Sequence, residues 1–326
     1  MRRREFIGLI GSVAATWPLA ARAQPPAMPV VGFIRSTSAA ASMPLVAAFR
    51  KGLAEAGLVE GKDVAIELRF ADDDFDRLPA LASDLVRLKV AVIVGNTFAV
   101  PAIRAATTTI PVVFVGGDDP VRTGLVTSLN KPGGNVTGIT SFGYALTTKR
   151  LQLLHELAPK SPAIAMLIDP HAADFAPEER QAKDAARTLG RDILVVKAGT
   201  APELEAAFAT ISRARPGALL VGGGAFLSRS QHRQVVAFAA RQALIAIYQL
   251  REAAVAGGLM SYGTNQPDTY RQAGVYAARI LNGEKPADLP VMQPTKFEFV
   301  INLKTAKTLG RAIPSGVLAI ADEVIE

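Results

Sequence analysis

The chain has 326 residues, of which 49% are hydrophobic and 20% are charged, so it can form one large domain or two domains of ordinary size. Its formal net charge is +7, but residues 1–23 hold four arginines and one glutamate, which account for +3 and leave +4. This mild charge, without a basic run that contains interleaved aromatic residues, argues against a dedicated nucleic-acid surface. The sequence has no cysteine, so hydrophobic cores must supply its stability without disulfides.

The N-terminus has the pattern of an export signal. A basic start precedes an apolar core at residues 6–19, and an A-x-A cleavage motif at residues 21–23 follows. Residues 3–7, RREFI, resemble a twin-arginine signal, and an ordinary secretory signal with extra arginines is the alternative. The apolar core is short for a retained membrane anchor, and no cysteine is present to carry a lipid. We therefore expect a soluble periplasmic protein that is not a lipoprotein.

From residue 30 onward, short apolar runs alternate with longer amphipathic stretches. In the first half, this pattern predicts strands at 30–34, 64–70, 90–95 and 111–116, and helices at 44–58, 75–88 and 98–108. In the second half, it predicts helices at 148–159, 177–190, 202–214 and 231–243, and strands at 163–169, 192–198, 217–223 and 244–248. Such alternation is typical of parallel sheets covered by helices. We predict an α/β fold with two similar wound units.

The C-terminal part is too short to form a third unit. It contains strands predicted at 259–263 and 297–301 and helices predicted at 268–283 and 304–310. These elements must join sheets that already exist. The proline-rich residues 285–294 are predicted to form an extended strap. The chain therefore crosses between the units several times, which predicts a hinge of several strands.

Ligands of open parallel sheets bind beyond the carboxyl ends of the strands. The side chains that follow the predicted strands are mainly small hydroxyls, amides, aromatics and carboxylates, and they include Ser36, Thr37, Asn96, Thr97, Asp119, Phe226, Tyr248 and Tyr262. This set suits a small polar ligand held by backbone and hydroxyl donors between aromatic walls. Local roles are the alternative: Ser36 and Thr37 could cap the next segment, and Asp119 could hold the turn before Pro120.

Catalytic and cofactor motifs are incomplete. His155, His171 and His232 lack metal-ligand spacing. The stretch GGLMSYG at 257–263 is not a nucleophile elbow, because Met and Tyr flank its serine. VGGGAF lacks the third glycine of a dinucleotide loop, and the glycines of KPGGNVTG at 131–138 are read as turn formers. We predict a protein that is not an enzyme, with no cofactor and no metal.

Three stretches carry a resemblance to a known family. Residues 118–140, 256–310 and 321–326 closely resemble ABC-transporter substrate-binding proteins related to tryptophan- and tyrosine-binding components. The resemblance covers essentially the whole mature chain and implies the type I periplasmic binding protein fold, with two Rossmann-like lobes that close on a ligand. We expect residues 1–23 to be the signal, lobe 1 to contain 29–142 and 264–291, and lobe 2 to contain 143–263 and 292–326.

The resemblance implies the solute-binding component of an ABC importer, with an aromatic or branched-chain amino acid as its ligand. The ligand carboxylate would accept hydrogen bonds from Ser36, Thr37, Asn96 and Thr97, helped by the helix that begins near residue 98. Asp119 would pair with the ammonium. The side chain would be walled by Phe142, Phe226, Tyr248 and Tyr262, for which core packing is the alternative.

The expected partners are a small-molecule ligand and a membrane permease, with the protein itself a monomer. Two alternatives remain open at this point. The ligand could be a nucleoside, a sugar or a small aromatic carboxylate, and the protein could be an extracytoplasmic sensor subunit.

Overall fold

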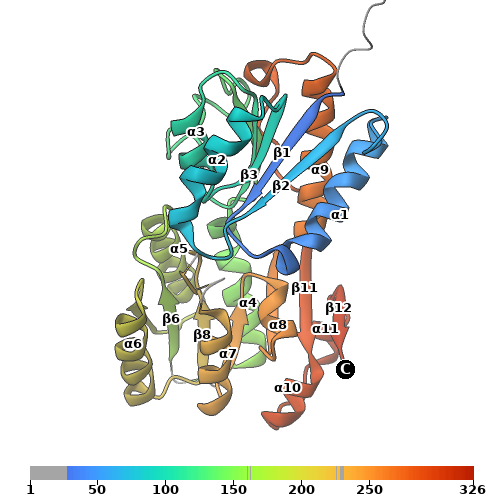
Figure 1. Cartoon of the computed structure of the whole chain (residues 1–326). Helices are drawn as coiled ribbons and strands as arrows, with labels where there is room; N and C mark the ends of the chain where they lie inside the picture. Colours follow the sequence, from blue (N-terminus) through green and yellow to red (C-terminus); the bar gives the residue numbers. More distant parts are fainter. Residues whose placement is uncertain (1–27, 160, 162, 225, 228–230) are drawn as a thin grey trace, which may run out of the picture.

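The computed structural model describes residues 28–159, 161, 163–224, 226–227 and 231–326 (Figure 1). The expected export signal at residues 1–23 lies outside these described residues. The described chain forms two sheets of five and seven strands, each covered by helices, which confirms the predicted α/β fold. We call the unit around the five-stranded sheet lobe 1 and the unit around the seven-stranded sheet lobe 2.

The sheet of lobe 1 is parallel throughout, with the order β2-β1-β3-β4-β5. Its strands are β1 (Val30–Arg35), β2 (Ala65–Phe70), β3 (Val92–Asn96), β4 (Val112–Gly116) and β5 (Val136–Thr140). One face packs against α1 (Ala39–Glu55) and α9 (Gln266–Leu281). The other packs against α2 (Leu78–Arg87) and α3 (Val100–Ala106). Alternation along β1 sends Phe33 to the first face and Ile34 to the second.

Strand β5 corrects one expectation. The glycines of residues 131–138 were expected to form turns, but β5 begins at Val136, and Gly138 lies inside it. Gly133 and Gly134 do form the turn, with φ of 72° and 67°. Gly138 serves packing instead, because a Cβ there would lie 2.2 Å from the carbonyl oxygen of Phe114 on β4. Glycine is required by this close approach of two strands.

The sheet of lobe 2 has the order β12-β11-β10-β9-β8-β6-β7, and only the β10–β11 pair is antiparallel. Its strands are β6 (Ile164–Ile168), β7 (Ile193–Lys197), β8 (Ala218–Val221), β9 (Ile245–Tyr248), β10 (Met260–Thr264), β11 (Phe297–Asn302) and β12 (Glu323–Ile325). One face carries α4 (Thr147–Leu157), α5 (Phe175–Thr188), α10 (Leu303–Thr308) and α11 (Ser315–Leu318). The other carries α6 (Ala201–Ala214), α7 (His232–Arg241) and α8 (Arg251–Val255). The C-terminal strands thus extend an existing sheet, as predicted.

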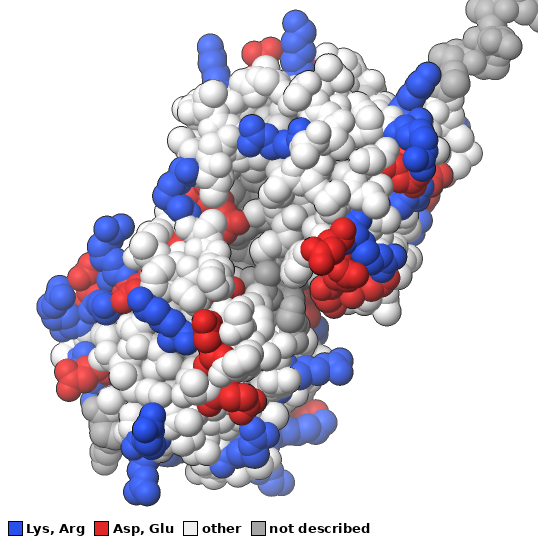
Figure 2. Space-filling model, turned by 60° about the vertical axis from the view of Figure 1, so that its left-hand side comes forward, with Lys and Arg blue, Asp and Glu red and all other residues white. Residues whose placement is uncertain are grey.

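In the described chain, three connections run between the lobes: residues 141–146, residue 265 and residues 293–296. The first contains the 3-10 turn η2 (Gly143–Leu146). The third follows the proline-rich strap, which was predicted to be extended. Its first part instead forms the 3-10 turn η4 (Pro286–Asp288), while Met292 donates to Gly138 and accepts from Thr140, so the second part runs along β5. Figure 2 shows the molecular surface hollowed between the two lobes.

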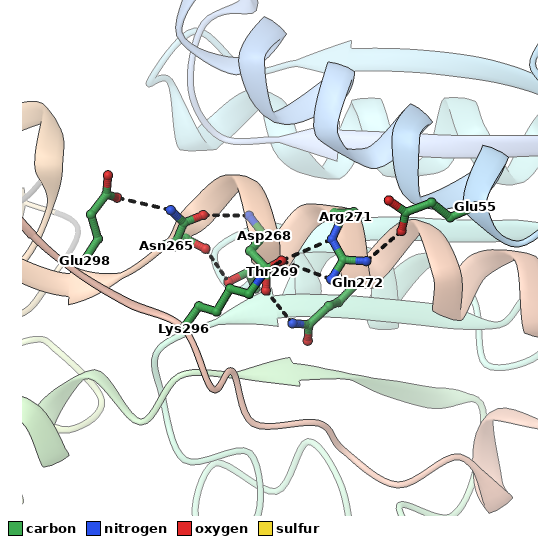
Figure 3. Close-up of polar contacts among 8 residues, drawn as sticks. All are labelled: Glu55, Asn265, Asp268, Thr269, Arg271, Gln272, Lys296 and Glu298. Atoms are coloured by element: carbon green, nitrogen blue, oxygen red, sulfur yellow. Dashed lines mark hydrogen bonds and ion pairs between the residues drawn. The ribbon is translucent and has the colours of Figure 1, made fainter. Parts of the chain in front are cut away.

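Polar contacts at the start of α9 join two of these connections (Figure 3). Asn265 donates from Nδ2 to Glu298 of β11 at 3.4 Å, and Lys296 contacts Asp268 at 3.4 Å. Arg271 then bridges Asp268 to Glu55 on α1, at 3.0 and 2.7 Å. The hinge is therefore tied to lobe 1 through charged side chains as well as through the backbone.

Candidate ligand-binding cleft

The hollow seen in Figure 2 lies between the two lobes, and the segments that follow β4 of lobe 1 and β6 of lobe 2 contact each other across the lobe boundary. The backbone N–H of Asp119, after β4 of lobe 1, donates to Asp174 of lobe 2 at 3.2 Å. Arg122 forms an ion pair with the same carboxylate. Because both segments follow the carboxyl ends of parallel strands, the space between them is the position where open α/β sheets bind ligands.

Three of the predicted polar residues lie together at the floor of this cleft. The Ser36 N–H donates to Asn96 Oδ1 at 3.1 Å, and Asn96 Nδ2 donates back to Ser36 Oγ at 2.9 Å. Thr37 Oγ1 lies 2.9 Å from Ser42 Oγ on α1. The fourth residue, Thr97, donates to the Val115 carbonyl at 3.3 Å. These bonds join β1, β3 and β4 just beyond their ends and give the floor a fixed shape.

Arg35 is a residue of this floor that the sequence analysis missed. It is the last residue of β1, its side chain is only 2% exposed, and its guanidinium contacts Thr37 and Tyr270. An arginine at the end of the buried run VVGFIR was a signal available in the sequence. Arginine is seldom fully buried unless it is paired.

Asp119 and Asp118 differ in how their carboxylates are used. Asp119 Oδ1 accepts the N–H groups of Val121 and Arg122, at 2.9 and 3.2 Å, and so holds the turn after β4. The half-buried Asp118 carboxylate accepts no hydrogen bond from any described residue, while its carbonyl is fixed by Thr140 at 2.6 Å. Burial raises the pKa of Asp118, and the charge of Arg122 opposes the rise. Of the two carboxylates, Asp118 is thus the one that can still accept hydrogen bonds from a ligand.

The four predicted aromatic residues lie in different surroundings, and within the described chain none of their rings stacks on another of the four. Phe142 sits in the first connection with φ of 42°. Tyr262 packs on Phe297 and Phe299 of β11, with ring centroids 6.2 Å apart in both pairs.

The other two aromatic residues belong to the core of lobe 2. Phe226 packs at its edge. Tyr248 is 3% exposed, and no described group lies within hydrogen-bond reach of its hydroxyl.

A further aromatic pair lies at the cleft edge of lobe 1. Phe75 follows β2 and Phe98 follows β3, and their rings pack edge to face with centroids 5.8 Å apart. Because β2 and β3 flank β1, the pair spans the end of β1. Phe75 is 39% exposed, unusual for an aromatic residue in a fixed contact. The sequence signal was their position just after predicted strands.

Lobe 2 contributes a buried carboxylate network below the cleft. Glu178, at the start of α5, accepts from the Gly223 N–H at 2.9 Å, from Gln249 Nε2 at 3.0 Å and from Thr147 Oγ1 at 3.2 Å. Its Oε1 lies 3.9 Å from Arg150 Nη1. Glu178 was not predicted as a site residue, because the residues PEER at the start of a helix have the pattern of a solvent-exposed face.

Nearby, Asp169 follows β6 and accepts from the His171 N–H at 2.9 Å. Burial raises the pKa of Asp169, and the hydrogen bond from His171 opposes the rise. None of the described helices is long and apolar enough to cross a membrane. Among the described residues, no group of three or more His, Asp or Glu side chains is placed to hold a metal ion.

The chain matches one family model and is similar to proteins of known structure. The model of a family described as ABC transporter substrate binding protein matches residues 30–325. The tyrosine-binding protein of Clostridioides difficile strain R20291 is 27% identical over 263 residues, covering 80% of this chain and 75% of that protein. The crystal structure of an ABC domain in complex with L-Trp from Streptococcus pneumonia is 25% identical, with a TM-score of 0.82, covering 91% of this chain and 99% of that one.

A conserved domain protein from Vibrio cholerae is 24% identical, with a TM-score of 0.81 and the same coverage of 91% and 99%. This likeness bears on the fold alone. Together with the L-Trp-bound structure, it confirms the prediction of two Rossmann-like lobes.

Proposed function

We propose, from the premise that the chain belongs to the ABC transporter substrate-binding protein family, that its lobes close on an aromatic amino acid. The predicted family and the type I periplasmic binding protein fold are confirmed. Support for the ligand class comes from the tyrosine-binding relative and from the L-Trp complex. The observation that carries it lies at the edge of lobe 1. There the Phe75–Phe98 pair follows β2 and β3, and the free carboxylate of Asp118 follows β4, the neighbour of β3.

Each part of an amino acid has a matching group at this edge. Asp118, in place of its turn-holding neighbour Asp119, would pair with the ligand ammonium, because its carboxylate is half-buried and free of donors. The Phe75–Phe98 pair, in which the Phe75 ring is exposed, would contact the ligand side chain. The floor of Ser36, Thr37 and Asn96 would face the ligand carboxylate. Phe142, in the first connection, would move towards the ligand as the lobes close.

The proposed cellular role is solute capture for an importer outside the cytoplasmic membrane. The hinge formed by the three connections at 141–146, 265 and 293–296 would let the lobes rotate from open to closed. The closed form would then dock on a membrane permease as a monomer. The proposed role is binding alone, with no reaction on the ligand.

Thermal denaturation with a panel of all proteinogenic amino acids tests this proposal. Tryptophan, tyrosine or phenylalanine is expected to stabilise the protein by about 2.7 kcal/mol at a concentration 100 times its Kd, because it binds only the folded state. Lysine and glutamate serve as controls, and no comparable shift is expected from them. If no amino acid raises the melting temperature, and uridine, ribose or benzoate does, the amino-acid assignment is wrong.

Replacing the buried Tyr248 by Phe is expected to leave affinity for L-tryptophan unchanged within about twofold. The change should stabilise the protein by about 1 kcal/mol, since it removes a buried hydroxyl that has no described partner. Urea denaturation and isothermal titration calorimetry measure the two quantities. Tyr276→Phe is the matched control and should destabilise, because that hydroxyl donates to the Pro290 carbonyl at 2.7 Å. A large loss of affinity in the Tyr248 variant would instead place this ring in the binding site.

A further inference from the structure

We propose that Arg35 binds the α-carboxylate of the ligand, an inference that rests on the proposed function. Arg35 and Arg150 are the largest fully buried side chains of the described chain. Both lie near the hinge, but they differ in the groups that surround their charge. That difference leaves the charge of Arg35 without a counter-charge among the described residues.

The guanidinium of Arg35 contacts only neutral groups. Its Nε and Nη2 lie 3.3 Å from Thr37 Oγ1, and Nη1 donates to the Tyr270 hydroxyl. Its central carbon lies 4.9 Å from the centroid of the Tyr270 ring. No described carboxylate lies within 4.0 Å of it. Because a guanidinium carries five N–H groups, donors remain for a further acceptor.

Arg150 provides the internal comparison. It donates to the carbonyls of Tyr262 and Gly143, at 2.8 and 3.1 Å, and lies 3.9 Å from the carboxylate of Glu178. Its charge therefore has a counter-charge inside the same lobe. A buried charge without a partner is costly, and proteins retain such a charge where something compensates it. For Arg35 the compensating group has to come from outside the described chain.

The position of Arg35 favours a ligand carboxylate. It ends β1 directly before Ser36, Thr37 and Ser38, and Ser38 caps the 17-residue helix α1. The first turn of α1 contains no acidic residue, so its positive end is not neutralised by the protein. An anion beside Arg35 would meet both the guanidinium and this helix end.

The neighbouring groups match the rest of an amino acid. Asp118 follows β4, two strands from β1 in the sheet, or about 10 Å at the usual strand spacing. That separation leaves space for a carboxylate and an ammonium joined by one carbon atom. The Phe75–Phe98 pair spans the end of β1 and so lies close to the same place.

The contact with Tyr270 gives Arg35 its specificity. Tyr270 is 2% exposed and packs on Phe33 with ring centroids 5.8 Å apart, so the guanidinium is held against a fixed ring. A planar, immobilised fork can bind a carboxylate through two parallel N–H donors, which a lysine ammonium cannot do. Arg35 would therefore discriminate acids from amines of the same shape.

Isothermal titration calorimetry with L-tryptophan, tryptamine and indole-3-propionate tests the proposal on the mature protein. The wild type should bind tryptophan at least about 30-fold more tightly than tryptamine, which lacks the carboxylate. Arg35→Gln should lower affinity for tryptophan and for indole-3-propionate by about 30-fold or more and change that for tryptamine little. Arg35→Lys should recover only part of the loss. Arg50→Gln, on the exposed side of α1 where Arg50 pairs with Glu60, is the control.

The outcomes separate the two proposals. If Arg35→Gln binds tryptophan as the wild type does, or if the wild type binds tryptamine as tightly as tryptophan, Arg35 does not bind the carboxylate and the proposed function stands. If the wild type binds none of the three compounds and no aromatic amino acid, the proposed function fails and this inference fails with it. The wild-type comparison needs no variant, so the test holds even if Arg35→Gln does not fold.

Discussion

Asp118→Asn is expected to weaken the binding of L-tryptophan by about 30-fold or more, because it removes the charge that pairs with the ligand ammonium. The same change should raise the melting temperature of the ligand-free protein. The Asp118 carboxylate is half-buried without a hydrogen-bond donor, and burial raises its pKa, so its charged form costs free energy in the folded state. Calorimetry measures the affinity, and thermal denaturation at pH 7 measures the stability.

Asp119→Asn is the matched control for this prediction. Asp119 holds its turn through Oδ1, and the amide oxygen of Asn can accept the same N–H groups of Val121 and Arg122. We expect a change in affinity below about threefold, far less than the loss of a buried charged pair. If Asp119→Asn weakens tryptophan binding more than Asp118→Asn does, Asp119 and not Asp118 pairs with the ligand ammonium. Indole-3-propionate lacks the ammonium and should bind the wild type and the Asp118 variant alike.

The pH dependence of the ligand-free protein follows from the same carboxylate. Since the pKa of Asp118 is raised in the folded state, the folded protein holds this proton at a pH where the unfolded chain has released it. The contribution of Asp118 to stability is therefore unfavourable at neutral pH and is relieved as the pH falls through its folded pKa. Ligand binding should change in the opposite direction, because the protonated acid cannot pair with an ammonium.

The sequence allowed the architecture to be predicted because its signals are local. The alternation of apolar runs with amphipathic stretches placed the elements from β1 to β11 within a few residues, with the exceptions of β5 and α8. Strand β5 was missed because Gly138 interrupts its apolar pattern, although the close approach of β4 requires that glycine. The elements α8, α11 and β12 are five, four and three residues long, which is too short for a periodic pattern to register.

The site was harder to predict than the fold. Which residues line it depends on the direction of each side chain and on contacts between residues that are far apart in the sequence. Ser36 and Asn96 were proposed because both follow predicted strands, and the fold brings them together across 60 residues. In β9, alternation sends Ile247 to one face and Tyr248 to the other, so Tyr248 enters a core. Nothing in the dipeptide Asp118-Asp119 indicates which carboxylate the turn will use. The contact of Arg35 with Tyr270 joins residues 235 positions apart, which a single sequence does not reveal.

The second large effect is expected from Glu178→Leu, which should lower the free energy of unfolding by about 3–5 kcal/mol. The change removes the acceptor for the Gly223 N–H, Gln249 and Thr147, and it leaves Arg150 without a counter-charge. Burial already lowers the pKa of Arg150 to about 10, against the opposing charge of Glu178. Urea denaturation measures the loss. Glu179→Leu is the neighbouring control, since Glu179 pairs with Lys183 and Lys197 at the surface and should cost less than about 1 kcal/mol.

A double variant, Glu178→Leu with Arg150→Met, separates the charge from the hydrogen bonds. Replacing both members of a buried ion pair by apolar residues often leaves the stability unchanged. Removing only one member leaves the other as an unpaired buried charge, which is destabilising. If the unpaired charge causes the loss, the double variant should recover most of it. Arg150 also donates to the carbonyls of Gly143 and Tyr262, in the first connection and in β10 before the second. If the double variant regains stability but binds tryptophan more weakly, the hydrogen bonds from Arg150 to these two carbonyls set the geometry of the closed lobes. A double variant as unstable as the two single changes summed would instead make the hydrogen bonds, and not the charge, the source of stability.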